Sequence, residues 1–361
     1  MKYRHIERVR VKLRLLSPTH IGSGEKMGKK EMIYDKVRNR LLIPSMPDMI
    51  DFFAVRCPPK TLERYEYFLQ QNTPEDLGSF LTRNYIRTDP LPDWIQRSVC
   101  VGADIRRVND LSLSVCNPEG RAYIPGSSVK GAMRTALIAA RMTESERVAL
   151  AREFRENSRY EMAADSILRK LRADERRPAE PVNDILKGLS VSDSAPFARE
   201  DMVICQRLDL GIGEYEPKGL STYSECIAPD SETDFYISID HNILPSAFLK
   251  ELEQALQFWD DLCYNSYDAL FENGGSDLAD TSCWEGIPLR LGADTGFQTH
   301  SLVYRAFDGR EAVDTANRIL QNNFKYTYKP KPNVQAAPYR QKVTMYDGKL
   351  YTMGRCEMIL T

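Results

Sequence analysis

The feature that most constrains the fold of this chain is a sharp turn leading into a helix, at residues 123–137. These residues read Tyr-Ile-Pro-Gly-Ser-Ser-Val-Lys-Gly-Ala-Met-Arg-Thr-Ala-Leu. An apolar strand end meets a Pro-Gly turn, and a serine then caps an alanine-rich helix. The first turn of such a helix has N–H groups without intrahelical partners, which favour a bound anion. Lys130 and Arg134 lie four residues apart on one helix face, so with Ser127 and Ser128 they predict a phosphate-binding site.

Three catalytic motifs resemble parts of this stretch, and each lacks an element. A P-loop requires Gly-Lys-Ser/Thr, whereas Lys130 precedes Gly131. A nucleophile elbow requires Gly-x-Ser-x-Gly, and Lys130 stands where its last glycine would be. Ser127-x-x-Lys130 matches a serine acyl-enzyme motif, but the companion Ser-Asp-Asn and Lys-Thr-Gly motifs do not occur. Two interpretations stay open here, an anion site and an ordinary capped helix with solvated charges.

A strand with one basic face is predicted near the N-terminus. Over residues 8–15, arginine and lysine at even positions alternate with valine and leucine at odd ones. A loop with Gly22, Ser23 and Gly24 follows, where a ligand can approach the backbone because glycine has no side chain. His20 is the only histidine beside this loop. Loops at strand ends often carry function, so this loop is a second candidate binding element.

Three motifs together resemble the RAMP superfamily of CRISPR proteins. They are Leu16-Ser-Pro-Thr-His-Ile-Gly-Ser-Gly24, Glu31-Met-Ile-Tyr-Asp35 and Tyr123-Ile-Pro-Gly-Ser-Ser-Val-Lys-Gly131. Within the superfamily, the chain is similar in length and motif order to the Csm5-type subunits of type III-A (Csm) effector complexes. The resemblance implies an α+β fold of two ferredoxin-like (RRM-type) RAMP domains with helical insertions.

The resemblance also implies a function in antiviral defence. Such a subunit binds crRNA, caps the 3′ side of the guide, and supports complex assembly and crRNA maturation by positioning RNA for host nucleases. Its partners would be crRNA and other Csm subunits, namely the backbone RAMP subunit and the small helical subunit. The guide would be held by shape and backbone, while base pairing reads sequence.

Composition restricts how such binding can work. The net charge is −2 and the pI is near 6.2, so any nucleic-acid site is a local patch. No apolar run approaches a membrane span, and the charged start is unlike a signal peptide. The eight cysteines are scattered without a Cys-x-x-Cys pair, which predicts reduced thiols in the cytoplasm and no metal site or cofactor.

The charged, proline-rich stretch at 174–181 is the expected boundary between domains. It predicts an N-terminal RAMP/RRM-like domain with helical insertions over 1–180 and a C-terminal RAMP-like domain over 181–361. Residues 61–97 are expected to be mostly helical. A long helix is expected over residues 245–270, with a core-facing apolar stripe.

A further RNA-binding candidate is the segment 324–346, which contains basic and aromatic residues and no acid. Its cations include Lys325 and Lys329, and tyrosines and a phenylalanine lie among them. Such mixing is typical of single-stranded RNA sites, which combine phosphate pairing with base stacking. The alternative is a surface loop whose rings pack on the domain.

Two other segments bear on RNA contact through the family resemblance. It implies that Arg106 and Arg107 belong to a hairpin that acts as a thumb across the guide. It also implies a Gly-x-Gly-x-Gly loop at 292–296, where Asp294 replaces the central glycine. A carboxylate there would repel phosphate unless Arg290 neutralises it.

The alternative function is a metal-independent ribonuclease that uses His20 with Lys130 or Arg134. A general base needs a positioned partner acid, and none is near His20 in sequence. Asp35 parallels the aspartate with which a related backbone subunit cuts RNA, but here a paired surface aspartate is expected. No catalytic residue is assigned, and the chain is predicted not to be an enzyme.

Overall fold

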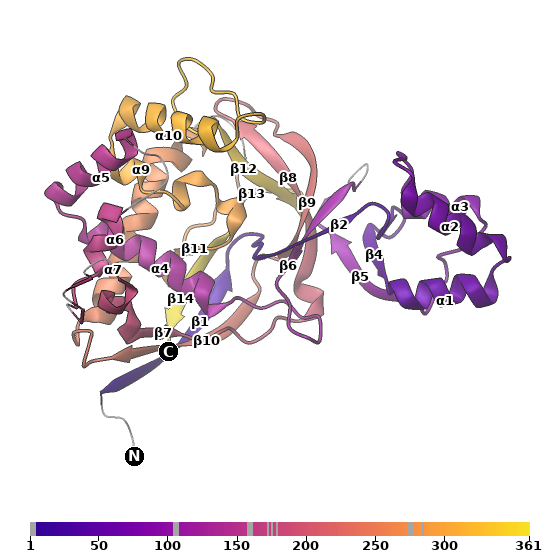
Figure 1. The fold of residues 1–361 in the computed structure, drawn as a ribbon, viewed down its shortest axis with the longest axis horizontal. Helices are drawn as coiled ribbons and strands as arrows, with labels where there is room; N and C mark the ends of the chain where they lie inside the picture. The colour runs from indigo at the N-terminus through magenta and orange to yellow at the C-terminus, as the bar shows by residue number, and fades with distance from the viewer. Residues whose placement is uncertain are drawn as a thin grey trace.

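The computed structural model describes residues 5–103, 108–156, 162–171, 173–174, 176–177, 180–272, 277–283 and 285–361. A large body contains two curled sheets with helices packed against them, and a small helical lobe projects from it (Figure 1). This arrangement confirms the expected α+β class with helical insertions. None of the helices in the described ranges is long and apolar enough to cross a membrane.

The first sheet joins the beginning of the chain to its end. Its strand order is β11-β14-β1-β10-β7. β1 (Ile6–Leu15) runs antiparallel to both β10 (Glu232–Asp240) and β14 (Arg355–Leu360). β7 (Leu189–Val191) and β11 (Ile287–Arg290) form the edges.

The predicted alternation of β1 is confirmed. Val11, Leu13 and Leu15 are buried in the core, because side chains on a strand point alternately to its two faces. On the opposite face, Arg8 lies over the Tyr236 ring at 3.9 Å, and the other cations pair with acids of the neighbouring strands, so this face is not a free basic surface. The ion pairs are Arg10–Asp234, Lys12–Glu232, Arg14–Glu232 and Arg14–Glu357.

The second sheet is mixed, because β5 pairs with β8, and β6 with β9, in parallel. Both sheets take strands from either side of residue 180, so the expected boundary there does not separate them. In sheet order the strands are β2 (Gly22–Gly28), β6 (Asp110–Ser114), β9 (Lys218–Ile227), β8 (Met202–Gly211), β5 (Ile95–Val101), β4 (Arg40–Pro44) and β3 (Ile33–Asp35), with β12 (Arg340–Tyr346) on β8 and β13 (Lys349–Thr352) on β12.

The helices of the body cover the sheets. α4 (Gly126–Arg141) packs on α7 (Phe248–Cys263), whose predicted core stripe is confirmed by buried Leu252, Leu256 and Trp259. The remaining body helices are α5 (Glu144–Glu156), α6 (Met162–Leu168), α8 (Ala269–Glu272), α9 (Val303–Ala306) and α10 (Gly309–Asn323).

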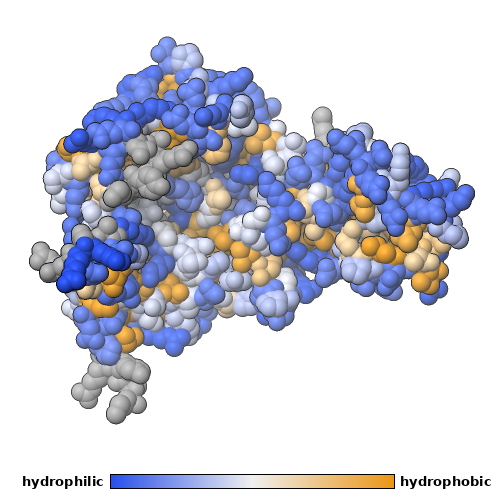
Figure 2. All heavy atoms as spheres, viewed as in Figure 1, coloured by the Kyte–Doolittle hydropathy of each residue, from blue (hydrophilic) through white to orange (hydrophobic). Residues whose placement is uncertain are grey.

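The lobe lies between β4 and β5 and has its own aromatic core. It contains α1 (Met46–Arg56), α2 (Lys60–Gln70) and α3 (Leu77–Arg83), so the helical prediction for 61–97 holds only as far as residue 83. Phe68 and Phe80 stack with ring centroids 4.9 Å apart. Apolar residues also reach the surface along one edge of this lobe (Figure 2).

Candidate nucleic-acid interface

A groove of about 550 Å³ lies where three segments that are distant in sequence meet. These are the residues after β1, the first turns of α4, and the turn after β11. The fold therefore brings together the two strongest sequence motifs and the glycine loop at 292–296. We call this site the glycine–serine groove, and its lining includes Ile21, Gly22, Ser127, Ser128, Gly131, Thr135, Gly292, Ala293 and His300.

Backbone contact joins the two halves of the groove. Gly292 has φ of +93°, and a Cβ there would lie 2.2 Å from the carbonyl oxygen of His20. Only glycine fits both that backbone conformation and that approach. His300, which no sequence motif marked, is exposed at this turn, with Nε2 3.0 Å from the carbonyl oxygen of Gly292 and 3.0 Å from Thr295 Oγ1.

His20 is a buried, hydrogen-bonded residue, with 6% of its surface exposed. Its Nδ1 lies 2.7 Å from the carbonyl oxygen of Glu225 and 3.4 Å from Ser114 Oγ. The carboxylate of Glu225 is turned to Arg97 and to the Ser114 N–H, so it does not serve as a partner acid. Burial, and the lack of a partner carboxylate in the described part of the chain, suit a histidine that supports the groove rather than a general base.

Gly22, Ser23 and Gly24 begin a strand rather than a loop. They open β2, which pairs with β6 through a register shift between Gly22 and Lys26. Residues 22–24 are all exposed, and Gly24 has φ of +88°. Ser23 Oγ donates to the carbonyl oxygen of Leu113 at 3.1 Å. The backbone here is accessible, as expected from the glycines.

The N-terminus of α4 differs from its prediction. Pro125 is the N-cap residue, without a side-chain cap, and the Gly126 N–H donates to Asp193 Oδ1 at 2.8 Å. The N–H groups of Ser128 and Val129 donate to the carbonyl oxygen of Pro125. The expected serine cap is therefore wrong, and the protein's own carboxylate already binds the first N–H of the helix, which disfavours a second anion there.

Lys130 and Arg134 do share a helix face, but that face contacts the protein. Lys130 Nζ donates to the carbonyl oxygens of Leu186 at 2.8 Å and Leu189 at 2.6 Å. Burial lowers the pKa of Lys130. Arg134 pairs with Asp184, and also with Asp165 at 3.0 Å. Burial lowers the pKa of Arg134, but both carboxylates raise it more, and the net pKa lies above its usual value.

The hydroxyls of Ser127 and Ser128 stay available at the groove. Ser127 is exposed and Ser128 is half-buried. Neither hydroxyl hydrogen-bonds to another group within the described ranges. They can therefore donate to, or accept from, a ligand without breaking a protein contact.

Asp294 faces inward, so it does not present its charge to the groove. It is 3% exposed, pairs with Arg207 at 2.5 Å, and accepts from Ser224 Oγ at 3.2 Å. The residue that neutralises Asp294 is therefore Arg207, not the Arg290 considered from the sequence. Arg290 lines the groove but is 8% exposed, and its charge is matched by Asp260 at 2.7 Å and Asp268 at 2.6 Å.

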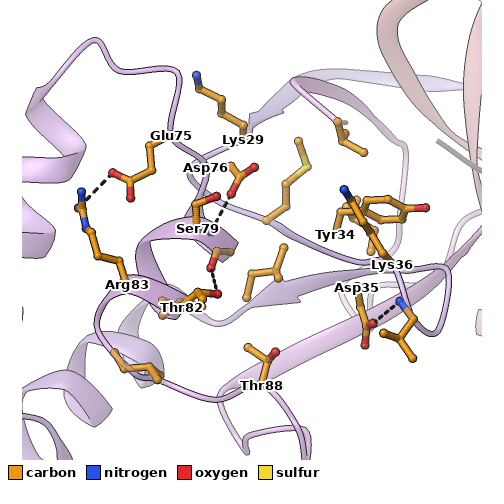
Figure 3. A pocket seen from close by; sticks show the side chains of 18 of the residues that line it. Lys29, Tyr34, Asp35, Lys36, Glu75, Asp76, Ser79, Thr82, Arg83 and Thr88 are labelled. Carbon is orange, nitrogen blue, oxygen red and sulfur yellow. Dashed lines mark hydrogen bonds and ion pairs between the residues drawn. The ribbon is translucent and has the colours of Figure 1, made fainter. Parts of the chain in front are cut away.

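A second cleft, of about 1300 Å³, lies at the base of the lobe and contains Asp35 (Figure 3). Asp35 accepts from the N–H groups of Val37 and Arg38 and pairs with the Arg38 guanidinium at 2.8 Å. Burial raises the pKa of Asp35, but these hydrogen bonds outweigh it and the net pKa is lowered. The expected pairing of Asp35 is confirmed. Glu75 and Arg83 form a second ion pair in the same cleft, so its lining carries both positive and negative charge.

Two further predicted sets of RNA contacts are not part of the groove as described. Arg106 and Arg107 fall outside the described residues. Lys325 and Lys329 are exposed after α10, and they share no residue with the groove lining.

The model of the RAMP superfamily matches residues 12–275. The chain belongs to the RAMP superfamily. It is 24% identical to Csm5 of Mycobacterium tuberculosis over 370 residues, with 96% of each chain covered. It is 25% identical to Csm5 of Enterococcus italicus, covering 97% of each, and 25% identical to Csm5 of Streptococcus thermophilus, covering 97% and 96%.

Solved structures agree with this assignment. The crystal structure of T. onnurineus Csm5 superposes with a TM-score of 0.66 at 19% identity, covering 96% of this chain and 99% of that one. A chain of the Csm–crRNA–target RNA ternary complex in a type III-A system superposes with a TM-score of 0.64 at 18% identity, covering 97% and 100%. The predicted resemblance to Csm5-type proteins and the ferredoxin-like RAMP fold with helical insertions are both confirmed.

Proposed function

We propose that this chain is the Csm5-type subunit of a type III-A effector complex, which holds crRNA and caps the 3′ side of the guide. The observation that carries the proposal is the glycine–serine groove, which brings three separate motifs to one surface. Similarity to Csm5 proteins over nearly the full length supports the complex as its context. In this role the chain supports assembly and positions the guide for maturation by other nucleases.

The groove would bind RNA through polar groups rather than through cations. Its available groups are the backbone at Gly22 and the hydroxyls of Ser127 and Ser128. Lys130 and Arg134 form the protein contacts that hold α4 in place. Hydrogen bonds from backbone and hydroxyl groups to phosphates and 2′-hydroxyls fix an RNA strand without reading its sequence, as a guide-binding subunit requires. In the same proposal, Arg106 and Arg107 contact the guide as a thumb.

The proposal assigns no catalysis to the chain. His20 is 6% exposed, so a ribose hydroxyl has little access to its ring, and no carboxylate among the described residues is placed to act with it. We assign His20 as a positioning residue that supports the backbone on which Gly292 rests.

The test is removal of the two available hydroxyls in Ser127→Ala/Ser128→Ala. Each lost hydrogen bond is worth about 0.5–1.5 kcal/mol, so crRNA affinity should fall about tenfold while the melting temperature stays unchanged. The matched control is Ser221→Ala/Ser246→Ala, which removes two exposed hydroxyls that are not part of the groove lining. Unchanged crRNA retention in the first variant would show that RNA does not lie in the groove. Complexes assembled without the chain should carry wrongly trimmed guides.

A further inference from the structure

The turn that follows α10 carries two groups of side chains, one packed on the protein and one facing solvent. The Phe324 N–H donates to the carbonyl oxygen of Leu320 at 2.8 Å, and the Tyr328 N–H donates to that of Phe324 at 2.9 Å. The helix ends at Asn323, Phe324 departs from helical backbone angles with φ of −123° and ψ of 49°, and a hydrogen-bonded turn follows. We call residues Phe324–Lys329 the aromatic–lysine turn.

One group of side chains packs on the body of the protein. The Tyr328 hydroxyl donates to Asn317 on α10, and its ring centroid lies 5.7 Å from that of Tyr339. The ammonium of Lys331 lies 4.8 Å from the Tyr339 ring. For these residues the alternative from the sequence is correct, since they anchor the segment.

The other group faces solvent. Phe324 is 54% exposed and Tyr326 is 94% exposed. Lys325 and Lys329 beside them are exposed and form no ion pair with any described residue. Residues 324–346 contain no carboxylate that could neutralise these lysines. The cations of β1 and α4, by contrast, contact protein groups. The aromatic–lysine turn differs from them because it combines exposed aromatic rings with lysines that are unpaired within the described ranges.

We propose that the aromatic–lysine turn binds single-stranded RNA, with unpaired bases stacked on Phe324 and Tyr326 and phosphates bound by Lys325 and Lys329. Rings accept any base because every base has a π-face, and lysines follow the backbone. Exposed aromatic rings also occur at protein–protein interfaces, but lysine is depleted there, so the two lysines favour RNA over a protein partner. The inference rests on the proposed function, which supplies the strand, and it adds a second contact for RNA that extends beyond the glycine–serine groove.

The test measures binding of the full chain to a short fluorescent single-stranded RNA and to the same sequence as a blunt duplex. Phe324→Ala/Tyr326→Ala should weaken single-strand binding by about tenfold or more and leave duplex binding unchanged, because duplex bases cannot stack on the rings. Lys325→Ala/Lys329→Ala should lower the salt slope for the single strand by about 1.4, the value for two phosphates. Both pairs are exposed, so melting temperatures should match that of the unmodified chain.

The matched control is Lys60→Ala/Tyr67→Ala, an exposed lysine and tyrosine on α2. Binding by both turn variants equal to that of this control would overturn the proposal. Equal losses for duplex and single strand would also overturn it, in favour of a simple charged patch. Retained RNA with loss of co-purified subunits would assign the turn to a protein interface instead. If Ser127→Ala/Ser128→Ala weakens RNA binding and the turn variants do not, the proposed function is supported and this inference is wrong. If only the turn variants weaken RNA binding, RNA contacts the turn and not the groove.

Discussion

Arg134→Met tests whether the cations of α4 hold the protein together or hold RNA. In the structure, the Arg134 guanidinium pairs with Asp184, which begins the short 3-10 helix Ile185–Gly188, and with Asp165 on α6. Methionine keeps the aliphatic packing and removes the charge. The variant therefore leaves the carboxylate of Asp184 without its guanidinium partner, in a half-buried position.

The expected cost follows from the exposure of the pair. The side chains of Arg134 and Asp184 are 28% and 14% exposed. Exposed pairs are worth about 0.2–1 kcal/mol, and breaking a buried pair costs about 3–5 kcal/mol. Asp184 also keeps the hydrogen bond from the Leu186 N–H at 2.8 Å, which limits the loss. We expect the free energy of unfolding to fall by about 2 kcal/mol, or roughly 3 °C in melting temperature for a chain of this size.

Thermal unfolding and a salt titration of RNA binding together decide between the two roles. Arg134→Met should lower the melting temperature, and Arg134→Met/Asp184→Asn should recover part of the loss because no unpaired charge remains. The salt slope of RNA binding should not change. A melting temperature equal to that of the unmodified chain, with a salt slope lower by about 0.7, would refute the reasoning and assign Arg134 to a phosphate.

Three further outcomes follow from the packing and charges. Gly126→Ala should strongly lower the free energy of unfolding, because the new Cβ would lie 2.2 Å from the carbonyl oxygen of Val191. The control Gly131→Ala adds a Cβ in open space and should raise the free energy of unfolding by about 1 kcal/mol, measured by chemical denaturation. Burial raises the pKa of Asp260, but Arg290 and Arg355 lower it more, so the net pKa is lowered. The ionised carboxylate therefore stabilises the fold above about pH 4, and this stabilisation is lost as the pH falls further. Asp260→Asn should reduce the change in melting temperature over this acid range. Purified chain should leave labelled crRNA precursor intact with or without divalent metal, and cleavage that His20→Ala abolishes would restore the ribonuclease alternative.

Local sequence patterns predicted those parts of the fold that depend on neighbouring residues. Alternation in residues 8–15 predicted β1, and the apolar period at Leu252, Leu256 and Trp259 predicted the buried stripe of α7. Both patterns reflect burial of one face, which a short window contains. The Pro-Gly turn likewise preceded a helix, α4, as its residue types indicated.

Contacts between distant residues were not predictable in the same way. Asp193 lies 67 positions from Gly126, yet it takes the helix N-terminus that a serine was expected to cap. Arg290 was the nearest arginine in sequence that could neutralise Asp294, but the fold brings Arg207 to it instead. Such partners are set by topology, which residue spacing alone does not specify.

Three of the places where this chain could have offered free positive charge are already occupied by its own carboxylates. Asp193 bonds to the N-terminus of α4, Asp184 pairs with Arg134, and acids of β10 and β14 match the cations of β1. A phosphate at any of these positions would have to displace an internal partner, and at Arg134 this would leave the Asp184 carboxylate, 14% exposed, unpaired. Because the net charge is also −2, long-range attraction does not draw RNA to the chain. In the proposed function, RNA binding therefore depends on short-range hydrogen bonds, on stacking at the exposed turn, and on neighbouring subunits that bring the strand close. Such weak long-range attraction suits a subunit that contacts a guide already held by other subunits.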